Sequence, residues 1–312
     1  MNPMKSAHGL LVVAIVALLS ASTARADLHV VTTTTDLADL AAAVGGARVK
    51  VESLCKGNQD PHYVQARPSY MVTLSRADLV IAAGLELEIG WLPALLQGAR
   101  NPEVLPGHAG YLDASSAITA IDVPRGAIDR SRGDVHALGN PHYWLDPQRA
   151  RRVAAAIARR LGELDPSGRQ SFDRNLRAVQ QRLDAALQRW TAALEPHRGA
   201  KVVSYHRTFD YFFERFGLQP LGYIEDRPGI PPAPAHVAQL IAAMRAAGVR
   251  VIFHESYFDR ATSDVIAKRT GARVLVLPTS VGGAGQASSY ERLIDLLVTS
   301  LVSAMREPEP AP

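Results

Sequence analysis

Short runs of β-branched and aliphatic residues alternate with amphipathic helical segments along the first half of this 312-residue chain. Residues 28–33, 49–54 and 78–82 have the pattern of strands, and helical patterns occupy 35–44 and the segment that begins at Pro68. Such alternation predicts a mostly parallel sheet with helices on both faces. The hydrophobic fraction of 47% is enough to bury that sheet, and it excludes an intrinsically disordered chain.

The same alternation resumes after Gly199. Strands are predicted at 201–205, 219–224, 249–253 and 274–277, and helices at 209–216, 235–247, 260–270 and 290–304. Between the halves, residues 147–194 are rich in Ala, Arg, Leu and Gln, with one break at Asp165-Pro166-Ser167. We therefore expect an α/β fold with two lobes, each a mostly parallel sheet flanked by helices, joined by one long rigid helix.

The N-terminus has the pattern of a secretory signal peptide. Lys5 precedes an apolar stretch from Leu10 to Leu19, and Ala24-Arg25-Ala26 marks the expected cleavage point. That stretch is about ten residues long, whereas a membrane-spanning helix needs about twenty. We expect a soluble periplasmic protein. The predicted boundaries are 1–26 for the signal peptide, 27–165 for the N-terminal lobe, 166–198 for the linking helix, 199–306 for the C-terminal lobe and 307–312 for a polar tail.

Cysteine content and charge exclude several classes of protein. Cys55 is the single cysteine, so the chain forms no intrachain disulfide and no cysteine-rich zinc finger. The formal net charge is only +4, and the basic residues are scattered among acidic ones. Nucleic-acid binding needs a clustered basic face, so we expect no nucleic-acid partner.

Three histidines follow strands or extended segments, each just before a helix. They are His62 in Asp60-Pro61-His62, His142 in Asn140-Pro141-His142 and His206 in Ser204-Tyr205-His206. In an open α/β sheet, ligands bind at the carboxyl ends of strands. Neutral imidazoles are common metal ligands, and three of them suit Zn²⁺. The Asp-Pro and Asn-Pro steps also fit ordinary turns, so the residues alone leave a structural role open.

The order of these motifs resembles one known family. The chain resembles the zinc/manganese-specific solute-binding proteins of ABC importers (cluster A-I). The features that carry the resemblance are the signal peptide, Asp60-Pro61-His62, the segment from Gly139 to Pro147 that reads GNPHYWLDP, the Tyr205-His206 strand end and the long helix. The resemblance covers essentially the whole mature chain. It implies two lobes around one metal ion, delivery to a membrane permease, no enzymatic activity and a monomer.

The resemblance also implies a set of metal ligands. His62, His142 and His206 match the three nitrogen-ligand positions of the family, and a histidine at the third position favours zinc over manganese. The family commonly has an Asp as fourth ligand where this chain has Thr279. A water molecule or Glu255 is the expected replacement. Glu255 also fits a role as a helix cap or an arginine partner, and strand alternation points the adjacent His254 the other way.

Two further residues accompany the motifs. His136 ends a loop from residue 127 that contains few other metal-binding side chains, and it fits either a role in metal capture or simple solvation. Asp146 is expected to cap the helix that Pro147 begins, and to orient a neighbouring imidazole.

Two other functions fit part of the pattern. Three histidines and a water also form a catalytic zinc site, with Glu255 as the general base of a secreted hydrolase. The chain lacks a His-Glu-x-x-His segment and a nucleophile elbow, which argues against that alternative. A metal-binding adhesin or metallochaperone on the same fold is the other alternative.

Overall fold

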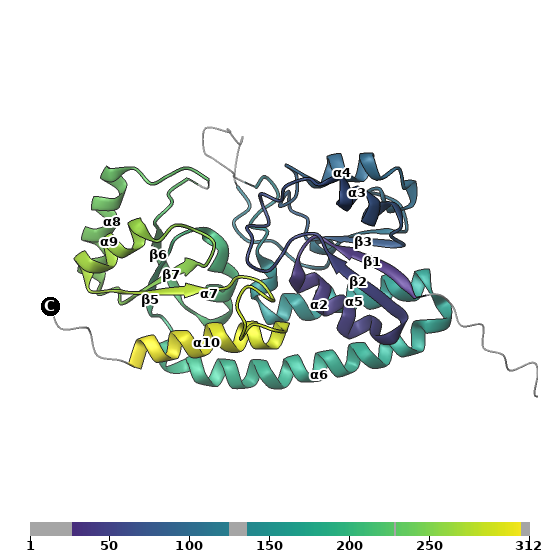
Figure 1. The fold of residues 1–312 in the computed structure, drawn as a ribbon. Coiled ribbons are helices and arrows are strands. Elements are labelled where there is room, and N and C mark those ends of the chain that lie inside the picture. The colour runs from purple at the N-terminus through teal and green to yellow at the C-terminus, as the bar shows by residue number, and fades with distance from the viewer. Residues whose placement is uncertain (1–26, 125–135, 228, 307–312) are drawn as a thin grey trace, which may run out of the picture.

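Two four-stranded parallel sheets form the two halves of the protein (Figure 1). The computed structural model describes residues 27–124, 136–227 and 229–306, so the expected signal peptide and tail lie outside the described residues. The strands of the first sheet are β1 (Leu28–Thr32), β2 (Val49–Ser53), β3 (Leu79–Ala82) and β4 (Tyr111–Asp113). Those of the second are β5 (Lys201–Ser204), β6 (Gln219–Tyr223), β7 (Val251–Glu255) and β8 (Arg273–Leu277).

The two sheets have the same strand order. The first is β2-β1-β3-β4 and the second is β6-β5-β7-β8, with every pairing parallel. In each sheet the first strand of the lobe is central. The second strand pairs with one edge of it and the third strand with the other edge. A crevice for ligands forms at the carboxyl edge of a sheet where the order reverses in this way. β5, which leads directly to His206, is such a strand.

The described helices cover the faces of the two sheets and run beneath both (Figure 1). They are α2 (Thr35–Gly45), α3 (Pro68–Ser75), α4 (Leu92–Ala99), α5 (Pro147–Leu164), α6 (Arg169–Leu194), α7 (Asp210–Phe216), α8 (Pro234–Ala247), α9 (Ala261–Thr270) and α10 (Tyr290–Arg306). α6 has 26 residues, so it is about 39 Å long, and it runs under both lobes beside α10. It is the predicted long helix, and the break at Asp165 separates it from α5.

Alternate residues of the strands face different cores. Val30 and Ile81 of the first sheet face a large apolar core, and Val202 and Phe253 of the second sheet face the same core. Their sequence neighbours point the other way: Val31 and Val80 pack under α3 and α4, whereas Val203 and Ile252 pack under α8 and α9. One hydrophobic core therefore continues from lobe to lobe, which opposes a hinge motion between them.

Polar contacts reinforce this junction. The indole Nε1 of Trp144 donates to the carbonyl of Thr279 at 2.8 Å, and the Asp36 carboxyl accepts from the backbone N–H of Val281 at 3.0 Å. Gly57 lies so close to the 281–283 loop that a Cβ atom there would be 2.0 Å from the carbonyl oxygen of Val281. The loop that precedes His62 is thus held against the second lobe.

The predicted architecture is confirmed: two α/β lobes with parallel sheets and a long linking helix. The sequence patterns did not reveal β4 or α4. β4 has only three residues, too few for an alternating pattern, and the eight residues of α4 (LPALLQGA) are almost all apolar, so they show no amphipathic period. None of the helices formed by the described residues has the length and apolar character needed to cross a lipid bilayer.

Candidate metal centre

Three imidazole rings from both lobes meet between the sheets. Each of His62, His142 and His206 offers a ring nitrogen, and these nitrogens lie within 4.8 Å of one another. The ring centroids are 5.1 to 5.6 Å apart. His62 stands in the loop between β2 and α3, and His142 lies just before α5, whereas His206 follows β5 in the second lobe. The predicted trio is therefore brought together across the lobe junction.

His62 and His142 are held by the same local arrangement. In Asp60-Pro61-His62, the Asp60 Oδ1 accepts from both the backbone N–H of His62, at 3.0 Å, and its ring Nδ1, at 2.7 Å. The Asn140 Oδ1 does the same for His142, at 3.0 and 2.8 Å. Proline fixes the backbone between acceptor and histidine, so the short motif sets the direction of the ring.

Glu225 holds His206. Its Oε2 lies 2.7 Å from His206 Nδ1, and its Oε1 accepts from the backbone N–H of Gly229 at 2.9 Å. Both side chains are more than nine-tenths buried. In all three histidines an oxygen acceptor at Nδ1 leaves the lone pair on Nε2, which is the tautomer that a metal ion needs.

Burial favours the neutral form of the His142 imidazole. Burial and the nearby rings of His62 and His206 lower the pKa of His142 well below its ordinary value. The His142 Nε2 is buried and has no hydrogen-bond partner among the residues that the structure describes. A buried ring nitrogen of this kind is costly unless something binds its lone pair. Burial opposes ionisation of Asp60, but hydrogen bonds from His62 outweigh it and lower the pKa of that carboxyl group.

The spacing of the ring nitrogens fits a transition-metal ion after a small contraction. Zinc holds imidazole nitrogen at about 2.0–2.1 Å in tetrahedral geometry, which places two ligand nitrogens about 3.3 Å apart. The observed upper limit is 4.8 Å, so each pair closes by at most about 1.5 Å. Side-chain torsions and small loop movements supply such a shift.

His136 lies at this centre. Its Nε2 is 3.1 Å from the Nε2 of His62, and the ring centroids are 5.2 Å apart. Burial, followed by the nearby imidazoles, lowers the pKa of His136 to about 3. Of the two roles that the sequence left open, the structure excludes simple solvation. The contact with His62 could not be located from the sequence, because the two residues are 74 positions apart.

Glu255 lies behind the histidines and outside the group of converging ligand atoms. It is completely buried at the end of β7. Its carboxyl group lies against the backbone of His206 and the hydroxyl of Thr208, and burial raises its pKa to about 8. Among the described residues it neither caps a helix nor pairs with an arginine, and its oxygens have no hydrogen bond of ordinary geometry. The adjacent His254 points away and contacts Ser263 at 2.9 Å, as predicted.

Thr279 occupies the place where the resemblance led us to look for a carboxylate ligand. Its hydroxyl is buried and forms no hydrogen bond of ordinary geometry within the described part of the chain, although the Tyr257 hydroxyl lies beside it. Its carbonyl holds Trp144 instead. Thr279 therefore contributes to the lobe junction.

Asp146 has one of its two predicted roles. Its carboxyl group caps α5 by accepting from the backbone N–H of Gln148 at 2.9 Å. The expectation that it also orients an imidazole is wrong, because Asn140 takes that role for His142. Asp146 instead pairs with Arg149 at 2.7 Å and Arg215 at 2.6 Å, and the latter pair ties α5 to α7.

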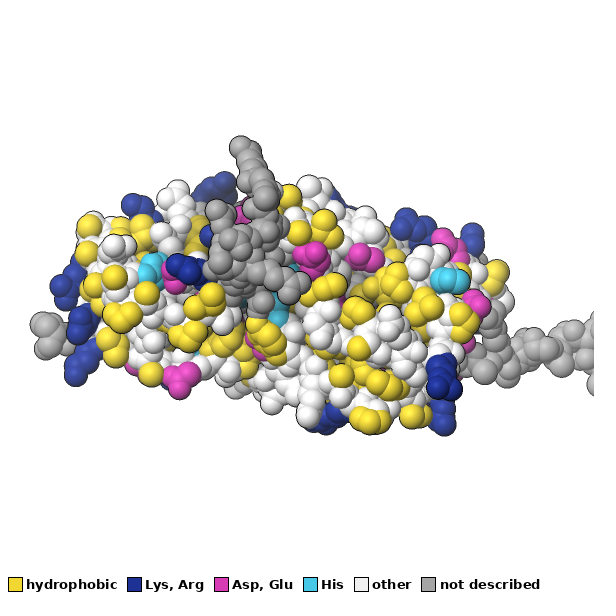
Figure 2. All heavy atoms as spheres, turned by 90° about the horizontal axis from the view of Figure 1, so that it is seen from above, with side chains coloured by type: hydrophobic (Ala, Val, Ile, Leu, Met, Phe, Trp, Pro, Cys, Tyr) yellow, Lys and Arg dark blue, Asp and Glu magenta, His cyan; other side chains and the backbone are white. Residues whose placement is uncertain are grey.

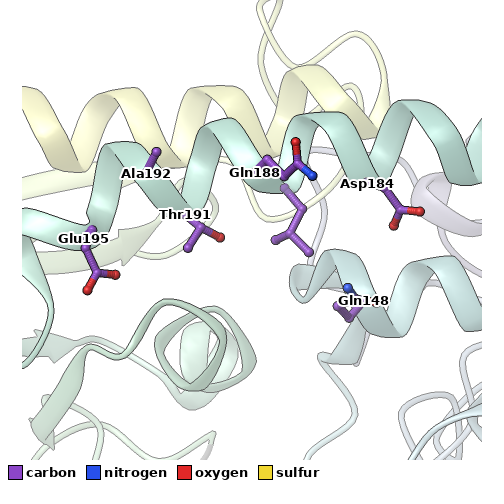
Figure 3. Close-up of a pocket in the computed structure, with 7 residues that line it drawn as sticks. Gln148, Asp184, Gln188, Thr191, Ala192 and Glu195 are labelled. Atoms are coloured by element: carbon purple, nitrogen blue, oxygen red, sulfur yellow. The ribbon is translucent and has the colours of Figure 1, made fainter.

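Two cavities differ in their relation to the histidines. A cavity of about 20 Å³, enough for one water molecule, lies beside the centre and is lined by Asp60, His62, Tyr63, His206, Glu225, Gly229 and Phe258. A larger one of about 670 Å³ lies between α6 and the start of α5 (Figure 3). Figure 3 shows Gln148 facing the α6 side chains across it. That cavity has no histidine or cysteine in its lining and does not reach the metal centre.

Comparison with known proteins agrees with the geometry. The family described as "Zinc-uptake complex component A periplasmic" matches residues 30–304. The high-affinity zinc uptake system protein ZnuA of Yersinia pestis is 29% identical over 293 residues, which cover 90% of this chain and 92% of that protein. The iron ABC transporter substrate-binding lipoprotein MtsA of Streptococcus pyogenes is 27% identical, with 80% of this chain and 79% of that protein covered.

A solved structure gives the same result for the fold. A crystal structure of ZnuA superimposes with a TM-score of 0.76 at 25% identity, and the alignment covers 89% of this chain and 99% of that one. The family match spans most of the described chain, including all three converging histidines. The chain therefore belongs to the ZnuA family, the periplasmic solute-binding components of zinc-uptake complexes.

Proposed function

We propose that this protein captures one Zn²⁺ ion in the periplasm and delivers it, as a monomer, to the permease of an ABC importer. The observation that carries the proposal is the convergence of His62, His142 and His206, with an oxygen acceptor fixing each ring. Imidazole rings that are already oriented by a hydrogen bond at Nδ1 need little reorganisation to bind a cation.

The donor atoms favour zinc. Imidazole nitrogen suits Zn²⁺, whereas Mn²⁺ prefers carboxylate, carbonyl and water oxygen, and zinc binds nitrogen-rich sites more tightly. The nearest carboxyl groups serve the rings instead: Asp60 and Glu225 accept hydrogen bonds from Nδ1 atoms. Relatives are named for zinc and for iron, so this argument rests on the donor set of the chain itself.

A hydrolytic zinc site receives no support from the position of Glu255. A general base must be ionised and must reach the metal-bound water. Burial raises the pKa of Glu255 to about 8, so the group is protonated at neutral pH, and it lies against the backbone of His206. We therefore propose binding and transport without catalysis.

Release depends on the loops more than on a hinge. The shared core and the Gly57 contact hold the lobes together, whereas His62 and His136 lie outside the helices and strands and next to exposed residues. The neighbouring side chains Tyr63 and Leu138 are 64% and 58% exposed. Figure 2 shows the face above the lobes, where hydrophobic side chains are spread over both halves and many Lys and Arg side chains lie toward the ends. A permease that binds near Tyr63 and Leu138 acts directly on the loops that carry these histidines.

Metal titration tests the proposal. The purified protein is stripped of metal and titrated with Zn²⁺ and with Mn²⁺ against a chelator of known affinity. The expected result is one zinc per chain, bound much more tightly than manganese. Tighter binding of Mn²⁺, or the absence of stoichiometric zinc, contradicts the proposal.

A further inference from the structure

His136 places a fourth imidazole beside the three histidines of the metal centre. His136 Nε2 and His62 Nε2 are 3.1 Å apart. Because His62 Nδ1 donates to Asp60, its Nε2 carries a lone pair that points toward His136. In a tetrahedral zinc site two nitrogen ligands lie about 3.3 Å apart. The observed separation is already close to the spacing that a shared metal ion imposes.

Contacts with the turn at Leu85 and Glu86 hold the His136 segment in place. Its side chain hydrogen-bonds the backbone of Leu85, and the backbone N–H of the next residue, Ala137, donates to Glu86 Oε2 at 2.7 Å. His136 is thus held on the side of the Leu85–Glu86 turn, and its Nε2 faces the lone pair of His62 Nε2.

The turn that provides these acceptors is conformationally strained. Leu85 and Glu86 have φ angles of 52° and 65°, in the left-handed region that residues with a Cβ atom rarely adopt. Such strain persists only where surrounding contacts enforce it, and it clusters at ligand sites. The Glu88 carboxyl group enforces this turn by accepting from the backbone N–H groups of Ala83, at 2.7 Å, and Gly84, at 3.1 Å.

We propose that His136 Nε2 is the fourth ligand of the bound zinc ion and closes a four-nitrogen site. This inference rests on the proposed function. His136 is not in the group whose nitrogens all lie within 4.8 Å of one another, so it is the ligand that completes the shell after the other three have bound. The His62 and His206 side chains are each only 9% exposed and His142 is buried, whereas His136 is partly exposed. His136 is therefore the ligand that leaves first when zinc is released.

A four-nitrogen shell has two consequences. It leaves no open position for water, which separates this centre from a catalytic zinc site. It also raises the preference for zinc over manganese, because the fourth donor is nitrogen instead of oxygen. Thr279, which has no carboxylate to offer, is then not needed as a ligand.

The experiment compares the wild-type protein with His136→Ala and with His108→Ala, an exposed histidine of the same lobe. Zinc affinity is measured by chelator competition, and ¹⁵N NMR of the histidine side chains counts the Nε2 atoms that shift on zinc binding. We expect four shifted Nε2 resonances in the wild type and three in His136→Ala. We also expect His136→Ala to bind zinc more than about 10-fold more weakly and to release it faster, since even groups that only orient a ligand contribute about 10- to 100-fold. His108→Ala should behave as wild type.

The outcomes separate this inference from the proposed function. If the wild-type protein binds one zinc through only three shifted Nε2 atoms, and His136→Ala binds as tightly as His108→Ala, the inference is wrong and the proposed function stands. If the wild type binds no stoichiometric zinc, the proposed function itself is wrong. Thermal unfolding of the metal-free variants shows whether His136→Ala retains the fold.

Discussion

The hydrogen bond between Glu225 and His206 gives a quantitative test of how the site is organised. The carboxylate is a double acceptor: one oxygen accepts from His206 Nδ1 and the other from the backbone N–H of Gly229. A glutamine side chain has one acceptor oxygen and one NH₂ donor. In Glu225→Gln, whichever way the amide turns, one of the two N–H groups faces a donor.

The expected loss follows from burial. A hydrogen bond to a charged group is worth about 1.5–3 kcal/mol in a protein, and both side chains here are more than nine-tenths buried, so solvent screens it little. We expect Glu225→Gln to weaken zinc binding by about 10- to 100-fold, equivalent to about 1.4–2.7 kcal/mol. The assay is chelator competition at neutral pH and constant ionic strength.

The matched control is Asp226→Asn. It removes the same charge one residue away, but Asp226 is exposed and its ion pair with Arg227 is long, at 3.9 Å. It should leave zinc affinity at the wild-type level. If both variants lose affinity equally, the loss comes from general electrostatic attraction of the cation, and the assigned role of Glu225 in orienting His206 is refuted.

Three further substitutions test other parts of the structure. Gly57→Ala places a Cβ atom 2.0 Å from the Val281 carbonyl oxygen, so it should lower the free energy of urea unfolding by about 1–3 kcal/mol and weaken zinc binding. In the control Gly90→Ala the new Cβ has nothing within 4 Å, so neither property should change. Burial raises the pKa of Asp36 to about 7, so between about pH 4 and pH 7 the folded protein keeps a proton that the unfolded chain has lost. The free energy of unfolding therefore falls as the pH rises through that range. Asp36→Asn should reduce this slope; an unchanged slope contradicts the assignment. Glu255→Gln should leave zinc affinity unchanged at pH 7, because that carboxyl group is already neutral; a large loss would identify it as a ligand.

The sequence predicts much of the fold because its information is local. Strand and helix patterns depend on neighbouring residues, so their alternation identified seven of the eight strands that the described residues form, and the long helix that joins the lobes. The continuous core between the lobes was not predicted. It depends on which alternate face each strand turns inward, as with Val30 and Val202, and no local pattern reports that those faces meet.

The same distinction applies to the site. The Asp-Pro-His and Asn-Pro-His motifs could have predicted that Asp60 and Asn140 orient the rings, because acceptor and histidine are two residues apart. Glu225 lies 19 residues from His206, and the Leu85 turn lies about fifty residues from His136, so neither contact leaves a pattern in the sequence. Asp146 was misassigned because its helix cap was visible in the sequence and its arginine partners were not.

The position of the bound metal ion tests the central claim most directly. A crystal structure of the zinc-loaded protein, with anomalous data collected at the zinc edge, locates the ion independently of the protein atoms. We predict a single strong peak about 2.0–2.1 Å from the Nε2 atoms of His62, His142 and His206, with each Nδ1 still bonded to Asp60, Asn140 and Glu225. A peak elsewhere in the molecule, or one that contacts histidines of a single lobe only, contradicts the account.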